Sequence, residues 1–269
     1  MRFSIDAKKL LNYLEDVSLK GKYYSGNSVS NAKSGALSDY AVFSISDVGC
    51  LSIMNASMSV ACRIDHWFPQ NLPSTRHITV GMCVIDIPSM VKHLKVFDGE
   101  VTFNRGDYIT LTQESKKASM SMVLNHPHME MVTRAHNYDM MQLTGPTIEG
   151  SPNVGGVKFG NVEYECKLCT LESDMLEASK VCDVTNNAKY KFEYNGGEEL
   201  TISSTKSDID YVSVDIDLIE GSGDPATVEF TGPFSKFMSG PVTIYMKDDS
   251  PILFSSTNRM LIKAPYLTR

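Results

Sequence analysis

The chain has 269 residues, of which 42% are hydrophobic, 9% aromatic and 21% charged. This composition excludes a disordered protein, and the length suits two domains of roughly 100–150 residues or one large domain. No stretch approaches the ~20 consecutive apolar residues of a membrane-spanning helix, and the first residues lack the apolar core of a signal peptide. A cytoplasmic protein without a membrane partner is therefore expected.

The net charge limits the kinds of partner. It is −7 at pH 7, with an isoelectric point near 5.4. A protein that binds DNA over its whole surface needs an excess of cations, so this class is excluded. A protein that gathers its lysines on a single surface is not excluded.

The first half of the chain contains the same succession of elements twice. A strand is expected at residues 2–5, and Asp6 is a candidate N-cap for a helix over residues 7–19 with apolar residues on one face. Two strands follow, at residues 41–45 and 59–64. The succession then repeats as a strand at 77–85, a helix at 88–97 and strands at 100–104, 108–113 and 118–124.

The second half has the same pattern after an irregular segment. Residues 125–160 contain three prolines and little periodicity, which is typical of a connector between domains and leaves room for one short strand. A third unit is expected as a strand at 162–168, a helix at 173–184 and strands at 189–194, 200–204 and 211–218. A fourth is expected as a strand at 227–230, a short helix at 233–238 and strands at 242–246, 252–255 and 259–263. Four βαβββ units thus predict an α+β fold with domains at 1–124 and 161–269, joined by a connector at 125–160.

Residue types with metal-binding or catalytic chemistry form no complete motif. Cys166 and Cys169 have the spacing of a metal-binding pair, but no second Cys or His pair accompanies them, so free thiols are expected. His126 and His128 are a weaker metal-binding candidate, because such a pair in a loop is more often simply exposed. No phosphate-binding loop, Gly-x-Ser-x-Gly elbow or His-Glu-x-x-His pair occurs. Neither catalytic residues nor a cofactor are predicted.

Three segments carry a resemblance to a known family. Residues 78–95, with two lysines three positions apart, resemble the second strand–helix unit of the proliferating-cell-nuclear-antigen (PCNA) family of DNA sliding clamps. Residues 6–11 resemble the first inner helix of that family with its lysine pair, and residues 262–266 resemble its terminal Ala-Pro motif. Lysine pairs on helices are usually just solvated, but their recurrence at the same place in successive repeats is expected to be informative.

Two features depart from the family. The fourth helix is cramped by proline and glycine, which is more similar to the clamps of tailed bacteriophages, and Glu177 stands where the family commonly has a basic residue. The resemblance therefore implies a divergent clamp, of viral or phage origin, with a thinner positive lining. Its location would be the host cytoplasm for a viral protein and the nucleus for a eukaryotic one.

The resemblance implies a DNA-clamp fold that assembles as a closed ring, with helices inside and sheets outside. Two domains per chain then require a homotrimer. Such a ring is a non-enzymatic processivity factor that encircles double-stranded DNA independently of sequence. DNA polymerase and the clamp loader would bind it through short peptide motifs.

The residues expected to carry this function form three groups. The DNA-facing residues are Lys8, Lys9, Lys92, Lys95, Lys180 and Lys236. The partner-peptide pocket is formed by Tyr40, Ala41, Phe43, Met140, Met141, Leu143, Ile262, Ala264 and Pro265. The subunit interface uses two edge strands, with Ala118, Met120, Met122, Leu124, Tyr211, Ser213 and Asp215. The alternatives are that the pocket residues are core residues and that either strand is internal.

Two other functions stay open at this point. One is a clamp-fold subunit of a heteromeric ring that serves as a checkpoint or transcription platform. The other is an enzyme with a dispersed active site.

Overall fold

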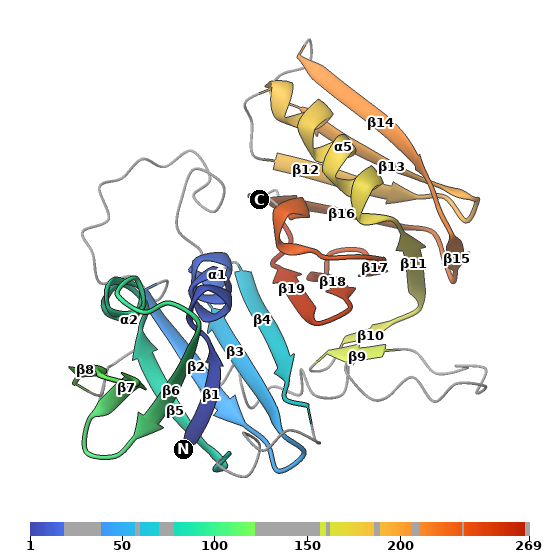
Figure 1. The fold of residues 1–269 in the computed structure, drawn as a ribbon. Helices are drawn as coiled ribbons and strands as arrows, with labels where there is room; N and C mark the ends of the chain where they lie inside the picture. Colours follow the sequence, from blue (N-terminus) through green and yellow to red (C-terminus); the bar gives the residue numbers. More distant parts are fainter. Residues whose placement is uncertain are drawn as a thin grey trace. The chain divides into compact units, whose positions relative to one another are not determined.

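The computed structural model of the chain describes residues 1–18, 39–56, 60–69, 78–121, 157–159, 162–185, 189–205, 210–232 and 234–266. These residues form two compact units (Figure 1). The first is built mainly from the described residues up to 121, and the second mainly from those after 156. No helix in the described ranges has the length and apolar character needed to cross a membrane.

The first unit contains two consecutive strand–helix–strand–strand–strand repeats. The first repeat consists of β1 (Arg2–Asp6), α1 (Ala7–Val17), β2 (Tyr40–Ile45), β3 (Cys50–Ala56) and β4 (Val60–Trp67). The second consists of β5 (Gly81–Asp86), α2 (Ile87–Leu94), β6 (Glu100–Arg105), β7 (Ile109–Gln113) and β8 (Lys116–Met120).

The two repeats exchange their first strands. Strand β1 pairs antiparallel with β6, which places Phe3 opposite Phe103 and gives a sheet of order β1-β6-β7-β8. Strand β5 pairs antiparallel with β2 of the first repeat, and the strands β5-β2-β3-β4 are neighbours in that order. Each sheet is completed by the other repeat, so the two repeats form one structural unit.

An aromatic cluster joins the two sheets of the first unit. The rings of Phe3 and Phe103 are stacked, with centroids 4.7 Å apart, and Phe43 of the other sheet lies 5.8 Å from Phe103. All three side chains are completely buried. Helix α1 adds Leu10 and Leu14 to the buried set, as its amphipathic pattern predicts, and each such side chain contributes about 1.5–3 kcal/mol of hydrophobic stabilisation.

The second unit begins with a hairpin and then contains two further repeats. The hairpin consists of β9 (Val157–Phe159) and β10 (Val162–Tyr164). The third repeat consists of β11 (Cys166–Thr170), α5 (Glu172–Cys182), β12 (Lys189–Tyr194), β13 (Glu199–Thr205) and β14 (Tyr211–Asp217), with a 3-10 turn η3 (Asp183–Thr185) after the helix. The fourth consists of β16 (Ala226–Thr231), the 3-10 turn η4 (Ser235–Phe237), β17 (Val242–Met246), β18 (Ile252–Ser256) and β19 (Arg259–Lys263), preceded by the short strand β15 (Glu220–Ser222).

The second unit repeats the strand exchange of the first. Strand β16 pairs with β12, and β11 pairs with β17, so each repeat again completes the sheet of the other. Phe192 and Phe230 pack at 5.2 Å, and Phe254 from the other sheet lies 5.8 Å from Phe230. The same topology therefore occurs twice in the chain, and the predicted α+β fold of repeated βαβββ units is confirmed.

Several boundaries differ from the predictions. Helix α1 ends at Val17 rather than at 19, and α2 spans Ile87–Leu94 rather than 88–97. Strands β3 and β15 were not predicted. The fourth helix is reduced to a single 3-10 turn, η4, and Phe237 of this turn and Phe234 just before it are almost completely buried. The predicted connector lies largely outside the described residues, so its bounds and those of the two domains stay a prediction.

Candidate functional site

The two helices of the first unit begin in the same way. Asp6 is the N-cap of α1, and its carboxylate accepts a 2.8 Å hydrogen bond from the backbone amide of Lys9. Asp86 is the N-cap of α2, and its carboxylate accepts a 2.7 Å bond from the amide of Ser89. Each cap satisfies a donor of the first helical turn that would otherwise lack a partner. The caps therefore identify equivalent positions in the two repeats.

The lysine pairs do not occupy equivalent positions. Counted from the caps, Lys8 and Lys9 lie in the first turn of α1, whereas Lys92 lies in the second turn of α2 and Lys95 is its C-cap. The prediction that the pairs recur at the same place in successive repeats is therefore wrong. The positions of α2 that match the first pair hold a proline and a serine.

A backbone hydrogen bond joins the start of α1 to the segment that follows α2. The amide of Ala7, the first residue of α1, donates a 2.8 Å hydrogen bond to the carbonyl oxygen of Gly99, which follows α2 closely in the chain. Helices α1 and α2 also pack against each other (Figure 1). The start of α1 therefore lies beside the segment that leaves α2. All four lysine side chains are exposed.

Charges of both signs lie at the start of α1, where the Asp6 carboxylate caps the helix and Lys8 and Lys9 follow it. A helix N-terminus carries a partial positive charge, so Lys8 and Lys9 add to it at a cost of about 0.3–1 kcal/mol each, whereas an anion there is stabilised. The ammonium of Lys9 lies 5.9 Å from the ring centroid of Tyr13. Burial, and secondarily the charge of Lys9, lower the pKa of His66 to about 4. Lys8 and Lys9 therefore supply exposed ammonium groups at this end, beside the Asp6 carboxylate.

The helical surface of the second unit is less basic. Helix α5 buries Met175 and Ala178, and exposes Glu177 and Lys180. Glu172 in its first turn accepts a 2.7 Å hydrogen bond from the backbone amide of Gly240. Lys236 lies on the turn η4, and its side chain is outside the part of the chain that the structure describes. Helix α5 therefore has one lysine and several carboxylates among its described side chains.

The predicted interface strands both lie at sheet edges. Strand β8 is the last strand of the sheet β1-β6-β7-β8, and β14 is the last of the sheet β14-β13-β12-β16. Within the described ranges, each has a strand neighbour on one side only. Their backbone groups on the other side are available to pair with another strand.

The two edges carry side chains of opposite charge. Strand β8 exposes Lys116 and Lys117, while β14 exposes Tyr211, Ser213 and Asp215. Of the other predicted interface residues, Ala118 is half-buried and Met120 is 8% exposed. Met122 and Leu124 lie outside the described residues.

The predicted partner-peptide pocket is not assembled from surface residues in the first unit. Tyr40 is half-buried on β2, but Ala41 and Phe43 are completely buried. Phe43 packs into the aromatic core, so its assignment to a surface pocket is wrong.

The other pocket residues belong to the end of the chain or to its connector. Ile262 is buried on β19, whereas Ala264 and Pro265 follow that strand and are half-buried. Met140, Met141 and Leu143 lie outside the described residues. The pocket as a whole stays a prediction.

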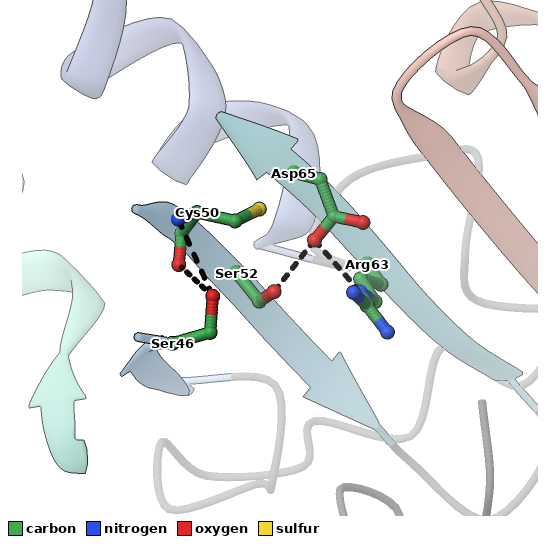
Figure 2. Close-up of polar contacts among 5 residues, drawn as sticks. All are labelled: Ser46, Cys50, Ser52, Arg63 and Asp65. Carbon is green, nitrogen blue, oxygen red and sulfur yellow. Dashed lines mark hydrogen bonds and ion pairs between the residues drawn. The ribbon is translucent and has the colours of Figure 1, made fainter. Parts of the chain in front are cut away.

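The sequence did not indicate a buried polar cluster on strands β3 and β4. The carboxylate of Asp65 accepts hydrogen bonds from the hydroxyl of Ser52, at 2.6 Å, and from Nε of Arg63, at 2.7 Å (Figure 2). Asp65 and Arg63 are two residues apart on one strand, so they lie on the same face of the sheet. Cys50 lies in the same region, and burial raises the pKa of its thiol to about 11. The charges neutralise each other and the thiol stays protonated, so the cluster has the properties of a structural ion pair.

The cysteines are all free thiols, as predicted. Burial, with a smaller contribution from nearby carboxylates, raises the pKa of Cys166 to about 12, so it is not the thiolate that metal binding requires. No cluster of three or more metal-ligating side chains occurs among the described residues. His126 and His128 lie outside them.

Solved structures that are similar over the whole chain include bacterial sliding clamps. The DNA polymerase III beta subunit of Thermotoga maritima matches 100% of this chain with a TM-score of 0.68 at 13% identity, and the DNA polymerase sliding clamp of Bacillus subtilis does so with a TM-score of 0.68 at 12%. The Helicobacter pylori beta clamp bound to a DNA ligase peptide also matches the whole chain, with a TM-score of 0.64 at 8% identity. No family model and no curated protein sequence matches.

This chain spans about two thirds of the length of those clamps, namely 66%, 65% and 67%. At such low identity the likeness shows the fold alone. The chain has the DNA sliding-clamp fold.

Proposed function

We propose that the chain is a DNA sliding clamp, a non-enzymatic processivity factor that encircles duplex DNA and tethers a polymerase to it. The observation that carries the proposal is the DNA sliding-clamp fold over the whole chain, on whose helices α1 and α2 the side chains of Lys8, Lys9, Lys92 and Lys95 are exposed. In a ring with its helices inside, these lysines face the DNA phosphates.

Lysine contacts of this kind suit a protein that has to slide. An ammonium group contacts a phosphate without reading the base sequence, and each contact is weak and salt-dependent. Bidentate contacts to base edges would instead hold the protein at particular sequences. The net charge of −7 fits the same proposal, because a small set of inward lysines leaves an acidic surplus for the rest of the surface.

The contribution of the two units to the lining is unequal. The first unit supplies four exposed lysines from two helices, whereas α5 supplies Lys180 beside Glu177, and the turn η4 supplies Lys236. We therefore expect the first unit to provide most of the electrostatic attraction to DNA. The proposed lining therefore carries fewer positive charges than the lining of a uniformly basic ring.

A closed ring needs more than one copy of this chain. The two units occupy about two thirds of the length of the bacterial clamps, and a homotrimer would bring six units together. Strands β8 and β14 are suited to close such a ring, because they lie at the edges of different sheets and carry opposite charges. Pairing of one copy's β8 with the next copy's β14 gives a head-to-tail interface.

Partners of the ring would dock through short peptides. A DNA ligase peptide is bound to the H. pylori clamp, which supports peptide docking as a property of this fold. We extend it here to a DNA polymerase and a clamp loader. Tyr40, Ala264 and Pro265 are the half-buried members of the predicted pocket, and they are its most accessible described residues. The divergent sequence is consistent with a viral or phage origin.

Two measurements test the proposal together. Light scattering should give a mass near three times 29.8 kDa for the assembled ring. The assembled protein should also stay on nicked circular DNA and be lost when that DNA is linearised, because only an encircling protein escapes over a free end. A monomer at every concentration, or equal loss from circular and linear DNA, would contradict the proposal.

A further inference from the structure

A small cavity in the second unit lies apart from the helix lysines and the edge strands. It forms where the first residues of β11 and β16 meet the last residues of β17, and its volume is about 230 Å³. Its walls come from Glu165, Cys166, Asp224, Pro225, Ala226, Met246, Lys247 and Asp248. All of these residues belong to the second unit, so the cavity does not depend on ring closure.

The floor of the cavity is apolar. Cys166 and Met246 face each other across the β11–β17 ladder and are 2% and 0% exposed, and Ala226 is 6% exposed. The Cys166 thiol is neutral at physiological pH because burial raises its pKa. The floor can therefore pack against the methylene groups of a side chain but offers it no charge.

The rim of the cavity is acidic. Glu165, Asp224 and Asp248 are exposed carboxylates, and the last two act electrostatically on the Cys166 thiol, which places them near the floor. Asp248 is held in place by a 2.6 Å hydrogen bond from the backbone amide of Thr227 to one of its oxygens. The second oxygen of a carboxylate held in this way remains able to accept a donor.

The one cation at the rim is already engaged. The ammonium of Lys247 donates a 3.1 Å hydrogen bond to the carbonyl oxygen of Glu163, a residue of strand β10 that does not line the cavity. Because the Lys247 ammonium is used in this way, it does not pair directly with the three carboxylates of the rim.

The backbone around the rim is closely packed. Gly223 has φ of +93°, and a Cβ atom built on it would lie 2.0 Å from the carbonyl oxygen of Glu165. Any larger residue would therefore push the segment that carries Asp224 away from β11. The position requires glycine for two independent reasons, the left-handed φ and the close approach. The acidic rim is thus held at a fixed place over the apolar floor.

We propose that this cavity binds a basic side chain, arginine or lysine, of a partner protein. Its apolar floor would pack against the aliphatic stem and its carboxylates would pair with the cationic head, as such amphipathic side chains require. Its volume is below the 300–1,000 Å³ that is typical of small-molecule sites, so it suits one side chain better than a cofactor. The three carboxylates repel phosphate groups, which excludes DNA as the occupant.

The test uses the full-length protein with methyl-labelled alanine and methionine. N-acetyl-arginine amide is titrated while the methyl signals of Ala226 and Met246 are followed by NMR. Saturable shifts in the millimolar range are expected at these two methyl groups. N-acetyl-citrulline amide, which has the same shape without the charge, should shift them much less. Equal shifts with citrulline amide, or no saturable shift with arginine amide, would overturn the proposal.

Variants of the rim sharpen the test. Asp224→Asn and Asp248→Asn keep the size of the side chain and should each weaken binding of the arginine probe about two- to fivefold. The matched control is Glu199→Gln, which removes an exposed carboxylate from β13 away from the cavity and should leave binding unchanged. If Glu199→Gln weakened binding of the arginine probe as much as the rim variants do, the general acidity of the protein rather than the cavity would hold the probe. That result would overturn the proposal.

Discussion

The carboxylate of Asp6 accepts a 2.8 Å hydrogen bond from the backbone amide of Lys9, and this contact starts helix α1. Asp86 makes the same contact with Ser89 at the start of α2. Each cap is the last residue of its strand, β1 or β5, and directly follows an isoleucine, Ile5 or Ile85. The relationship ties Lys8 and Lys9, which we propose to face DNA, to the fold, because the cap sets the position at which the first turn of α1 presents them.

Removal of the Asp6 cap should destabilise the protein without changing its surface elsewhere. Asp6→Ala leaves the Lys9 amide without its acceptor and should lower the free energy of unfolding by about 1 kcal/mol, whereas Asp6→Asn should retain most of the stability. Urea unfolding followed by circular dichroism measures the difference. Glu15→Ala is the matched control, since it removes an exposed carboxylate from the same helix. An equal loss in the control would contradict the capping role.

Replacement of the helix lysines should weaken DNA binding in a salt-dependent way. The double variants Lys8→Ala/Lys9→Ala and Lys92→Ala/Lys95→Ala should each reduce the slope of log K against log salt by about 1.8, since each lost phosphate contact contributes about 0.9. All four side chains are exposed, and Lys8 and Lys9 lie unfavourably at a helix N-terminus, so no substitution should lower the unfolding free energy by more than about 0.5 kcal/mol. Fluorescence anisotropy with duplex DNA at several salt concentrations provides the measurement.

The control for the lysine variants lies on a sheet of the second unit. Lys189→Ala/Lys191→Ala removes two lysines that pair with Glu229 and Glu193, and it should leave the salt slope unchanged. The lining assignment is wrong if this control lowers the slope as much as the helix variants do. It is equally wrong if polymerase processivity is unaffected by Lys92→Ala/Lys95→Ala.

DNA binding by the second unit, if α5 faces DNA as proposed, should respond to a single added charge. Glu177→Lys on α5 exchanges an exposed carboxylate for an ammonium and should increase the salt slope by about 0.9 if the new lysine reaches a phosphate. Glu177→Gln removes the repulsion between this carboxylate and the DNA phosphates but adds no ammonium group. It should therefore strengthen DNA binding without increasing the salt slope. No gain in affinity with either variant would show that α5 does not face DNA.

Much of the fold follows from local patterns in the sequence. Leu10, Leu14 and Val17 recur at helical spacing, and all three are buried on the face of α1 that packs against the core. The four repeated units are also evident from the alternation of strands and helices, although the first was predicted with one strand too few. Strand β3 was missed because Leu51, Ser52 and Ile53 are all buried, so both faces of the strand are covered and no alternation of apolar and polar residues marks it.

The candidate site depends on contacts that local patterns do not contain. The hydrogen bond between Ala7 and Gly99 joins residues far apart in the chain, and it is what brings the start of α1 to the end of α2. The lysine spacing alone suggested equivalent positions in the two helices, which is wrong. Phe43 shows the same limit: a single phenylalanine on a strand is more often a core residue than a pocket residue, and only its packing on Phe103 decides between the two.

His66 should make the stability of the protein depend on pH. Its pKa is lowered from 6.5 to about 4, chiefly by burial, so the folded state binds this proton less readily than the unfolded state. The contribution of neutral His66 to the free energy of unfolding is fully present above pH 6.5 and is lost as the pH falls from 6.5 toward 4. Because the ring is partly accessible, we expect the loss to be about 1–2 kcal/mol rather than the full value of the shift.

A substitution isolates the histidine from other acid effects. His66→Phe keeps ring contacts with Tyr13 and Phe68 but cannot titrate, so the unfolding free energy of this variant should depend less on pH between 4 and 6.5. His93, which hydrogen-bonds the Ser89 carbonyl oxygen on α2, provides the comparison, and His93→Phe should retain the dependence. Identical pH profiles for the wild-type and His66→Phe proteins would contradict the assignment.

Charge reversal at the two edge strands should control assembly of the ring. Lys117 is exposed on β8 and Asp215 is exposed on β14, where it accepts a 2.6 Å hydrogen bond from the hydroxyl of Thr201. If these strands pair between copies, Lys117→Glu places like charges in the interface and should weaken association at least about fivefold. Light scattering over a range of protein concentrations measures the effect.

The double variant distinguishes pairing of the strands from a general effect of charge. Lys117→Glu combined with Asp215→Lys restores opposite charges across the proposed interface, so it should recover much of the lost association. Lys191→Glu on the interior strand β12 changes the net charge as much as Lys117→Glu does, and it should leave assembly unchanged because this strand already has neighbours on both sides. A double variant that associates no better than either single variant would show that β8 and β14 do not face each other, and ring closure would then have to use other edges.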